Sequence, residues 1–477
     1  MQYKWIVLSN TTLGVLMSGL DTNIVLIALP TIAKELPGTS LLDLILVLLG
    51  YQLITASVLI NFGRLADMFG RVKLYNLGFA IFTIGSALCG FSQSGTQLII
   101  FRMIQALGAA FLFSNSAALI TDAFPEQERG KALGINQVAM IVGSVIGLVL
   151  GGFMTGAIGW RSIFLINIPI GIFATIWSHY QLHELAAIGK GQKMDIPGNI
   201  TLVAGIVTIL TTMTLYAIAL IGFLEFCLFL GCGIILIAAF AWIETRTKQP
   251  MLDLSLFKIR MFSAGNIAIF LNSLARGAVS LVLILYLQGP APYMMGLDPL
   301  TAGIFVLPVS AALVIFGPAS GWLSDRYGAR TLASLGLLVS SVGFLLVTGI
   351  GLTVTFQQIL IPLILIGAGM GLFMAPNRAS IMNSVPPETR GIASGTSTTL
   401  MNLGGVFSLG LTFLILATST SMADLTSIFF GGTPEHDPSL WIGNFLNSIH
   451  FVFLLSTIFL LIAIIPSVLR GPKAKFD

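Results

Sequence analysis

Long apolar segments follow one another along almost the whole chain, and this pattern constrains the fold more than any other feature of the sequence. A helix crosses about 30 Å of hydrocarbon with roughly 20 apolar residues. Because the segments are continuous rather than alternating in polarity, helices are predicted and not membrane strands. Fourteen segments reach this length, at 5–30, 41–62, 74–93, 98–121, 131–155, 161–182, 197–218, 221–243, 262–287, 299–320, 331–350, 356–377, 391–416 and 445–468.

The composition supports a chain that lives mainly in lipid. Hydrophobic residues make up 56% of the 477 positions and charged residues only 9%, whereas a soluble domain has about 25% charged residues. This excludes soluble, secreted, nucleic-acid-binding and disordered classes. An all-α integral membrane protein is expected, with the lipid bilayer as its surroundings and no nucleic-acid partner.

The distribution of positive charge predicts the orientation of the spans. Nineteen of the 23 Lys and Arg residues fall on one side if the spans alternate, and that side is expected to be the cytoplasm. Both termini are then cytoplasmic. The first apolar run is too long for a cleaved signal and lacks a small-residue cleavage site, so a multi-pass protein of the cytoplasmic membrane is predicted.

Sequence patterns for chemistry are sparse. Cys89, Cys227 and Cys232 all lie within predicted spans and are interpreted as small apolar residues, not as a disulfide or a metal site. His179 and His183, beside Glu184, are interpreted as interfacial residues. No phosphate-binding loop of the G-x-x-x-x-G-K-[ST] type occurs. We therefore expect no catalytic residues, no metal, no cofactor and no ATP-driven pumping by this chain.

Two pairs of similar loops indicate an internal duplication. GRLADMFGRVK at 63–73 resembles GWLSDRYGAR at 321–330, and PEQERGKALG at 125–134 resembles PETRGIASG at 387–395. The offsets, 258 and 261 residues, nearly agree. The chain is therefore divided into a six-helix bundle at 1–186, two inserted helices with linkers at 187–260, and a second six-helix bundle at 261–477. Duplicated parallel halves suggest a transporter that works around a central site.

The first loop has the residues of a conformational latch. Gly63 permits close helix packing, Gly70 permits a tight turn, and Asp67 and Arg71 are spaced to pair. Such a cluster would favour one orientation of the two halves. Ordinary charges of the cytoplasmic face are the alternative. The other residues assigned to gating are Asp122, at the end of the fourth span, and Gly321, Asp325, Arg326 and Arg330 in the second copy.

The motifs together resemble the major facilitator superfamily and, within it, the fourteen-span drug:proton antiporters. The loop at 63–73 is similar to the signature G-x-L-x-D-x-x-G-R-x-K between spans 2 and 3. The resemblance extends over nearly the whole chain. Further similar segments are LDTNIVLIALP at 20–30, RMIQALGAA at 102–110, GSVIGLVLGG at 143–152, WRSIFLINIPIG at 160–171, PMLDLSLF at 250–257 and YLQ at 286–288.

Asp21 is the candidate proton carrier. The antiporter signature L-D-x-T-x-V-x-x-A-L-P places an acid here, although Asn23 replaces its Thr. Asp21 lies sixteen residues after Trp5, about 24 Å along a helix. Burial favours the protonated carboxyl, which suits proton coupling. A structural acid that bonds a neighbouring helix is the alternative.

Arg102 is the expected partner of Asp21. It matches the span-4 pattern R-x-x-Q-G-x-G-A-A, with Ala106 in place of the first Gly. A pair between the two would solve both desolvation problems, and protonation of Asp21 would break it. An arginine that extends to the outer headgroups is the alternative.

Glycines of the fifth span resemble the antiporter signature G-x-x-x-G-P-x-x-G-G, but Leu148 stands where the signature has Pro. This departure weakens the expectation of antiport more than that of the fold. Packing by small residues alone is the alternative. The glycines that fit are Gly143, Gly147, Gly151 and Gly152.

The predicted function is export of hydrophobic, often cationic small molecules in exchange for protons by a monomeric secondary transporter. Arg276, which matches no signature, instead favours an anionic or zwitterionic metabolite carried by a specific exporter or symporter. A membrane enzyme or sensor is the remote alternative. Residues assigned to substrate contact from their positions in the spans are Gln52, Asn115, Asn272, Arg276 and Gln288.

Overall fold

The computed structural model confirms an all-helical membrane architecture. It describes residues 2–185, 195–217, 219–247, 250, 252, 254–277, 279–289, 294–351, 354–386, 390–419 and 438–471. Within these residues no strand occurs, and fourteen helical segments are long and apolar enough to cross a membrane. The predicted fold class and span count are therefore confirmed.

Contacts divide the chain into two compact units. Unit 1 comprises 1–203, 246–251 and 298–303, and unit 2 comprises 204–245, 252–297 and 304–477. The division of the sequence into three domains stays a prediction. The helices of unit 1 are α1 (Tyr3–Glu35), α2 (Leu41–Phe69), α3 (Arg71–Gly90), α4 (Gly95–Ala123), α5 (Glu126–Ala157), α6 (Ser162–Leu165) and α7 (Asn167–Gln181).

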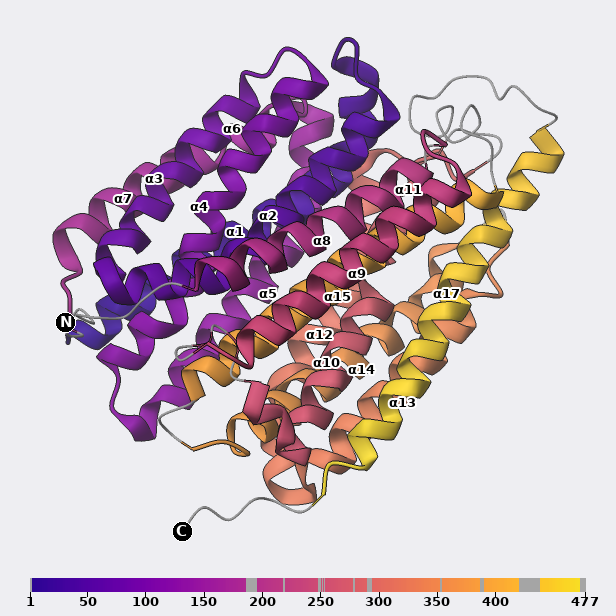
Figure 1. Cartoon of the computed structure of the whole chain (residues 1–477). Coiled ribbons are helices and arrows are strands. Elements are labelled where there is room, and N and C mark those ends of the chain that lie inside the picture. The colour runs from indigo at the N-terminus through magenta and orange to yellow at the C-terminus, as the bar shows by residue number, and fades with distance from the viewer. Residues whose placement is uncertain are drawn as a thin grey trace. The chain divides into compact units, whose positions relative to one another are not determined.

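Serine side chains cap the starts of α2 and α4, and glycines bring helices of this unit close together. Ser40 and Asp43 form a reciprocal capping box at the start of α2, which satisfies two backbone N–H groups. Figure 1 shows α1, α3, α4 and α7 side by side, in agreement with their contacts. A Cβ on Gly143 or Gly147 of α5 would strike the backbone of α1, and a Cβ on Gly19 of α1 would strike that of α5. These glycines allow α1 and α5 to pack backbone to backbone.

Unit 2 contains most of the remaining spans. Its helices pack on one another through apolar faces, with α13 on α14 and α17, and α10 on α15 and α17. The helices are α9 (Phe223–Glu244), the 3₁₀ turn η1 (Leu254–Lys258), α10 (Arg260–Arg276), α11 (Val279–Gln288), α12 (Pro299–Tyr327), α13 (Ala329–Val347), α14 (Phe356–Met382), α15 (Arg390–Ser419) and α17 (Pro438–Val468). The first residues of α12 belong to unit 1.

The ninth span agrees with the single helical segment predicted at 262–287. It is one span over Arg260–Gln288, in which the structure describes α10 and α11 on either side of residue 278. Gly277, directly after α10, has helical dihedral angles, φ −58° and ψ −33°. A Cβ on Gly277 would strike the carbonyl oxygen of Gly405 and the side chain of Ser408 on α15, so this glycine allows α15 to approach the span closely.

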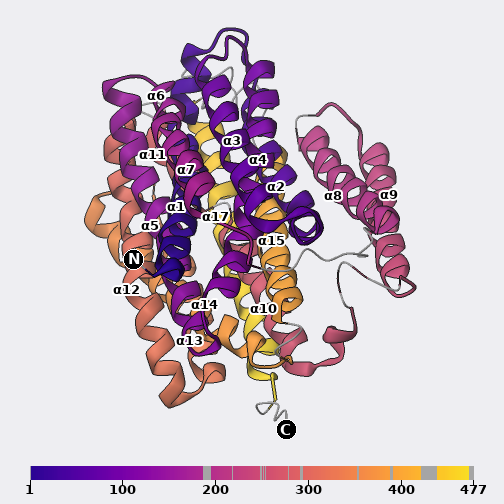
Figure 2. The same cartoon turned by 90° about the vertical axis from the view of Figure 1, so that its left-hand side faces the viewer.

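The helices α8 (Ile196–Ala217) and α9 lie side by side in Figure 2. Gly205 of α8 packs on Ile237, and Gly233 of α9 packs on Ile209, without room for a Cβ at either glycine. Much of the apolar surface of α9 is exposed, including Leu228, Ile235 and Trp242. A helix that is apolar on all sides and exposed fits a position against lipid.

Candidate functional site

Asp21 and Arg102 form a fully buried ion pair in unit 1. Arg102 Nη1 lies 2.6 Å from Asp21 Oδ2, and the two side chains are 2% and 0% exposed. The predicted pairing is thus present in the structure. The role of the pair in proton coupling stays a prediction.

Neutral polar side chains complete the surroundings of the Asp21 carboxylate. Gln105 Nε2 donates to Asp21 Oδ1 at 2.8 Å, and Asn167 Nδ2 donates to the same oxygen at 3.2 Å. Gln105 Oε1 also accepts from Arg102 Nη1 at 2.7 Å, so this amide touches both charges. We call Asp21, Arg102, Gln105, Asn167 and Ser86 the Asp21 network.

Ser86 links the two amides. Its Oγ accepts from Gln105 Nε2 and from Asn167 Nδ2, each at 3.0 Å, and donates its own proton to the Phe164 carbonyl at 3.0 Å. The ring Asp21–Gln105–Ser86–Asn167 is therefore closed by hydrogen bonds from α1, α3, α4 and α7. All four side chains are 0% exposed.

The environment of Arg102 shows why this pair must stay matched. Its guanidinium carbon lies 4.0 Å from the centre of the Tyr51 ring, a cation–π arrangement, and its Nε is buried without a partner in the described part of the chain. Removing one member of a buried pair costs about 3–5 kcal/mol, because the other charge stays uncompensated. Each of the two charges is therefore stable in this buried position only while the other is present.

The ends of α2 and α4 and the start of α3 carry a second charged group, the Arg71 cluster, formed by Asp67, Arg71 and Asp122. Arg71 Nε lies 2.7 Å from Asp67 Oδ1, and Arg71 Nη1 lies 2.7 Å from Asp122 Oδ1. One guanidinium thus connects the end of α2 to the end of α4. The three side chains are 19–36% exposed, so each pair contributes modestly on its own.

Glu184, interpreted from the sequence as an interfacial residue, caps α3. Its carboxylate accepts backbone N–H groups of Arg71, Val72 and Lys73 at 3.1, 2.9 and 3.1 Å. Gly70, the residue before α3, offers no side chain for this purpose. A carboxylate at a helix N-terminus is favoured both by these bonds and by the helix dipole.

The two glycines of the loop behave differently. Gly70 has φ of +108°, as the predicted tight turn requires, and a Cβ there would also meet Glu184 Oε1. The close packing predicted at Gly63 is not found: an added Cβ there would meet only Ser114 Cβ at 3.9 Å, an ordinary contact. Close helix packing therefore does not explain Gly63 in this conformation.

Fewer of the predicted features are found in the second copy of the loop, at 321–330. Gly328, just before α13, has φ of +85° and repeats the turn of Gly70. Gly321 has open space where a Cβ would lie, and Arg326 and Arg330 are exposed. The side chain of Asp325 lies outside what the structure describes, so its predicted pairing stays a prediction.

The glycines of the fifth span all have crowded surroundings. Cβ atoms on Gly143 and Gly147 would strike α1 backbone, one on Gly151 would meet Ile24 and Ile27, and Gly152 has no room for one either. This is the close packing expected from the sequence. It does not decide between packing alone and a role in transport direction.

The residues assigned to substrate contact belong to both units. In unit 1, Gln52 is half-buried in α2, and Asn115 of α4 donates to the Phe111 carbonyl at 2.8 Å. In unit 2, Gln288 ends α11, and Asn272 and Arg276 are one turn apart on α10. Arg276 is half-buried, and its Nε has no partner among the described residues.

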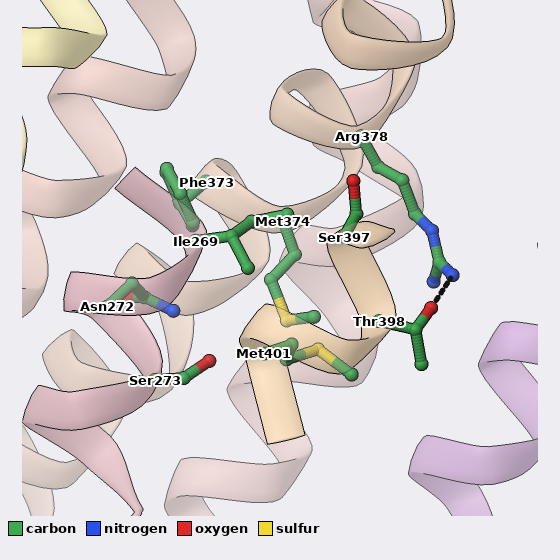
Figure 3. A pocket seen from close by; sticks show the side chains of 9 residues that line it. All are labelled: Ile269, Asn272, Ser273, Phe373, Met374, Arg378, Ser397, Thr398 and Met401. Atoms are coloured by element: carbon green, nitrogen blue, oxygen red, sulfur yellow. Dashed lines mark hydrogen bonds between the residues drawn. The ribbon is translucent and has the colours of Figure 1, made fainter. Parts of the chain in front are cut away.

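Asn272 lines a small cavity in unit 2. The cavity is about 20 Å³, room for about one water molecule. Arg378 Nη2, at its edge, donates to Thr398 Oγ1 at 3.2 Å. The side chains that line the cavity come from α10, α14 and α15 and are labelled in Figure 3: Ile269, Asn272, Ser273, Phe373, Met374, Arg378, Ser397, Thr398 and Met401.

Sequence reasoning missed Ser86, Asn167 and Glu184 as members of these clusters. Asn167 lies within the segment 160–171 that was noted only as typical of the family. Uncharged polar residues inside spans are common, and nothing in the sequence identifies their partners. Asn167 and Ser86 could have been singled out only as buried polar groups that require hydrogen bonds.

Comparison with known proteins identifies the family. The model of the Major Facilitator Superfamily matches residues 11–190 and 265–475. The chain belongs to the major facilitator superfamily. The unmatched stretch between the two matches contains α8 and α9.

Relatives in this superfamily include transporters with different cargo. The chain is 35% identical to the riboflavin transporter RibZ of Clostridioides difficile, over 87% of this chain and 88% of that protein. It is 29% identical to the multidrug transporter protein MdtP of Bacillus subtilis, over 86% of this chain and 74% of that protein. The crystal structure of a bacterial homologue of the lysosomal transporter Spinster has a similar fold, with a TM-score of 0.65 at 19% identity, covering 98% and 97% of the two chains.

These findings make the protein a multi-pass membrane transporter of the major facilitator superfamily with a small-molecule substrate. The fold and the family point away from an enzyme. The superfamily's multidrug exporters are among its relatives, and so is a transporter named for one vitamin.

Proposed function

We propose that this transporter exchanges protons for a small molecule across the cytoplasmic membrane by alternating access. The observation that carries the proposal is the buried pair of Asp21 and Arg102. An ion pair with both members almost completely buried is costly to maintain and sensitive to a single proton. These are the properties required of a site where proton binding changes the conformation.

The coupling step follows from the contacts of the pair. A proton on Asp21 removes the negative charge that compensates Arg102. Arg102 is then left with Gln105 Oε1 as its acceptor and the Tyr51 ring. It becomes favourable for the protein to adopt an arrangement in which Arg102 regains solvent or another anion, and the substrate is released or bound in that change.

The Arg71 cluster is proposed to set the balance between conformations on the cytoplasmic side. Arg71 holds the ends of α2 and α4 together, and Glu184 fixes the start of α3 beside it. Each contact is individually weak and partly solvated. A cluster of this strength can be broken once per transport cycle.

Two substrate classes remain, and different observations favour them. Export of hydrophobic or cationic compounds is supported by the relatives named as multidrug transporters, such as MdtP at 29% identity. A specific transporter of one polar compound is supported by the 35% identity with a protein named for riboflavin and by the cations Arg276 and Arg378 in unit 2. Both classes use the same coupling site.

The remaining features of the proposal are expectations from the sequence. The distribution of Lys and Arg supports a cytoplasmic position for both termini. The transporter acts as a monomer, without a cofactor, and takes its energy from the proton gradient. It does not act as an enzyme.

Proton release on substrate binding tests the proposal. In exchange transport the substrate and the proton favour opposite states, so substrate binding should expel a proton into weakly buffered solution. Purified wild type and Asp21→Asn would be titrated with ethidium and with riboflavin, with binding followed by tryptophan fluorescence and proton release by a pH-sensitive dye. The compound that binds is expected to release protons from wild type and not from Asp21→Asn.

Asp298→Asn provides the matched control. Asp298 lies outside the spans, and hydrogen bonds from the Thr301 side chain and backbone lower the pKa of its carboxyl. It should therefore be ionised throughout the assay. The variant Asp298→Asn should release as many protons on substrate binding as wild type does. Saturable binding without proton release from wild type would contradict the exchange mechanism.

A further inference from the structure

Asn167 is a buried amide whose orientation is dictated by its two neighbours. Nδ2 faces Asp21 Oδ1 at 3.2 Å and Ser86 Oγ at 3.0 Å. Ser86 has already donated its only proton to the Phe164 carbonyl, so its oxygen can only accept. Both neighbours are therefore acceptors, and the nitrogen of the amide must point toward them. Asn167 Oδ1 is buried without a partner in the described part of the chain.

The local sequence places this amide at a break in the sixth span. Pro169 has no N–H, so the carbonyl of Leu165 loses its usual helical donor. The helix α6 ends at Leu165, and α7 begins at Asn167. Proline within the first turn of a helix is well tolerated. The break thus sets the first side chain of α7 against α1 and α3.

We propose that Asn167, held by Ser86, is a positioning residue that stabilises the ionised form of Asp21 and so sets the pH at which the transporter loads its proton. This inference rests on the proposed function of Asp21. The Asn167 amide donates to the charged carboxylate, and a donor of this kind favours the charged state. Asn167 itself carries no charge and transfers no proton.

The charged and titratable groups around Asp21 come from three helices. They are Arg102 on α4, Tyr51 on α2 and Cys89 on α3. The helices α5, α6 and α7 also pack on α1. Of their described side chains, the ionisable ones lie near the first residues of α5 and the last residues of α7, and α6 has none. The pH dependence at Asp21 therefore reflects Arg102 and the neutral donors, of which Asn167 is one that can be removed without removing charge.

Infrared difference spectroscopy measures this directly, because a protonated carboxyl has a carbonyl stretch that a carboxylate lacks. Purified full-length protein would be titrated with acid, and the Asp21 signal assigned by its loss in Asp21→Asn. Asn167→Leu removes the donor at similar volume and should move the midpoint of this signal to higher pH by about one unit, a tenfold change. Ser86→Ala leaves the Gln105 and Asn167 amides less constrained and should also move the midpoint of the Asp21 signal to higher pH, by roughly half a pH unit.

Asn136→Leu is the control for a merely structural effect. Asn136 lies on α5, is 8% exposed and accepts from Ser116 at 3.2 Å, without a bond to the Asp21 network. Its replacement loses a buried hydrogen bond but should leave the midpoint at the wild-type value. If Asn167→Leu and Ser86→Ala both keep the wild-type midpoint, or if Asn136→Leu moves it equally, the inference is wrong.

Failure of the inference is distinguishable from failure of the proposed function. The spectroscopic midpoint reports only the protonation of Asp21. If Asp21→Asn releases as many protons on substrate binding as wild type does, the coupling role is lost. In that case the midpoint shift of Asn167→Leu still measures whether Asn167 positions the carboxylate.

Discussion

Breaking the pair of Asp21 and Arg102 one member at a time should have unequal effects. In Asp21→Asn, Arg102 stays 2% exposed and keeps one strong acceptor, Gln105 Oε1 at 2.7 Å. The uncompensated charge should lower the free energy of unfolding by about 3–5 kcal/mol. In Arg102→Gln, the carboxyl keeps donors from Gln105 and Asn167 and can also take up a proton, so a loss of about 1–2 kcal/mol is expected.

The double variant Asp21→Asn/Arg102→Gln contains only amides at the site and should be more stable than the sum of the single losses predicts. The interaction energy should be about 2 kcal/mol or more, within the range for residues in direct contact. Reversible unfolding of the purified protein in mixed micelles would measure all four forms. An interaction energy below about 0.5 kcal/mol would refute the argument that the two charges are energetically coupled.

Three further outcomes follow from particular contacts. Glu184→Ala should speed hydrogen exchange of the backbone amides at 71–73 by roughly fivefold or more, since a helix cap contributes about 1 kcal/mol. Glu225→Ala, which removes the cap of α9 instead, should leave the exchange of these amides unchanged. Equal exchange rates in the two variants would argue against the cap. Gly147→Ala should destabilise the protein by a few kcal/mol, because its Cβ would strike the backbone of α1. Gly134→Ala, on the same helix with open space around it, should stabilise the protein by about 0.5–1 kcal/mol. If both substitutions changed the measured free energy of unfolding in the same direction, the packing described for α1 and α5 would be contradicted.

The sequence was a good guide to the number of helices and a poorer one to their ends. Hydropathy reports the part of a helix that lies in hydrocarbon, whereas the backbone continues into the polar region, so α1 extends over Tyr3–Glu35 beyond the predicted 5–30. The close approach of α15 to Gly277 was not predictable, because Gly277 lies in an apolar run without any polar signal. This approach is a contact between segments far apart in the chain.

Charges inside spans were predictable because each is expensive without a partner. Asp21 and Arg102 could therefore be paired from sequence, with their family motifs in agreement. The amide and hydroxyl groups of Gln105, Asn167 and Ser86 gave no comparable signal, because such groups can be satisfied by many neighbours, including their own helix. Glu184 was missed for a related reason: its carboxylate oxygens accept from backbone N–H groups, which have no sequence signature.

The central claim is that Asp21 couples proton movement to substrate movement, and separating these two movements tests it most directly. Proteoliposomes containing wild type or Asp21→Asn would be loaded with the compound that binds, and two rates measured: exchange of labelled for unlabelled substrate at equal pH, and uphill accumulation driven by a proton gradient. Wild type should perform both. Asp21→Asn should keep the exchange and lose the accumulation, whereas accumulation by Asp21→Asn at the wild-type rate would contradict the account.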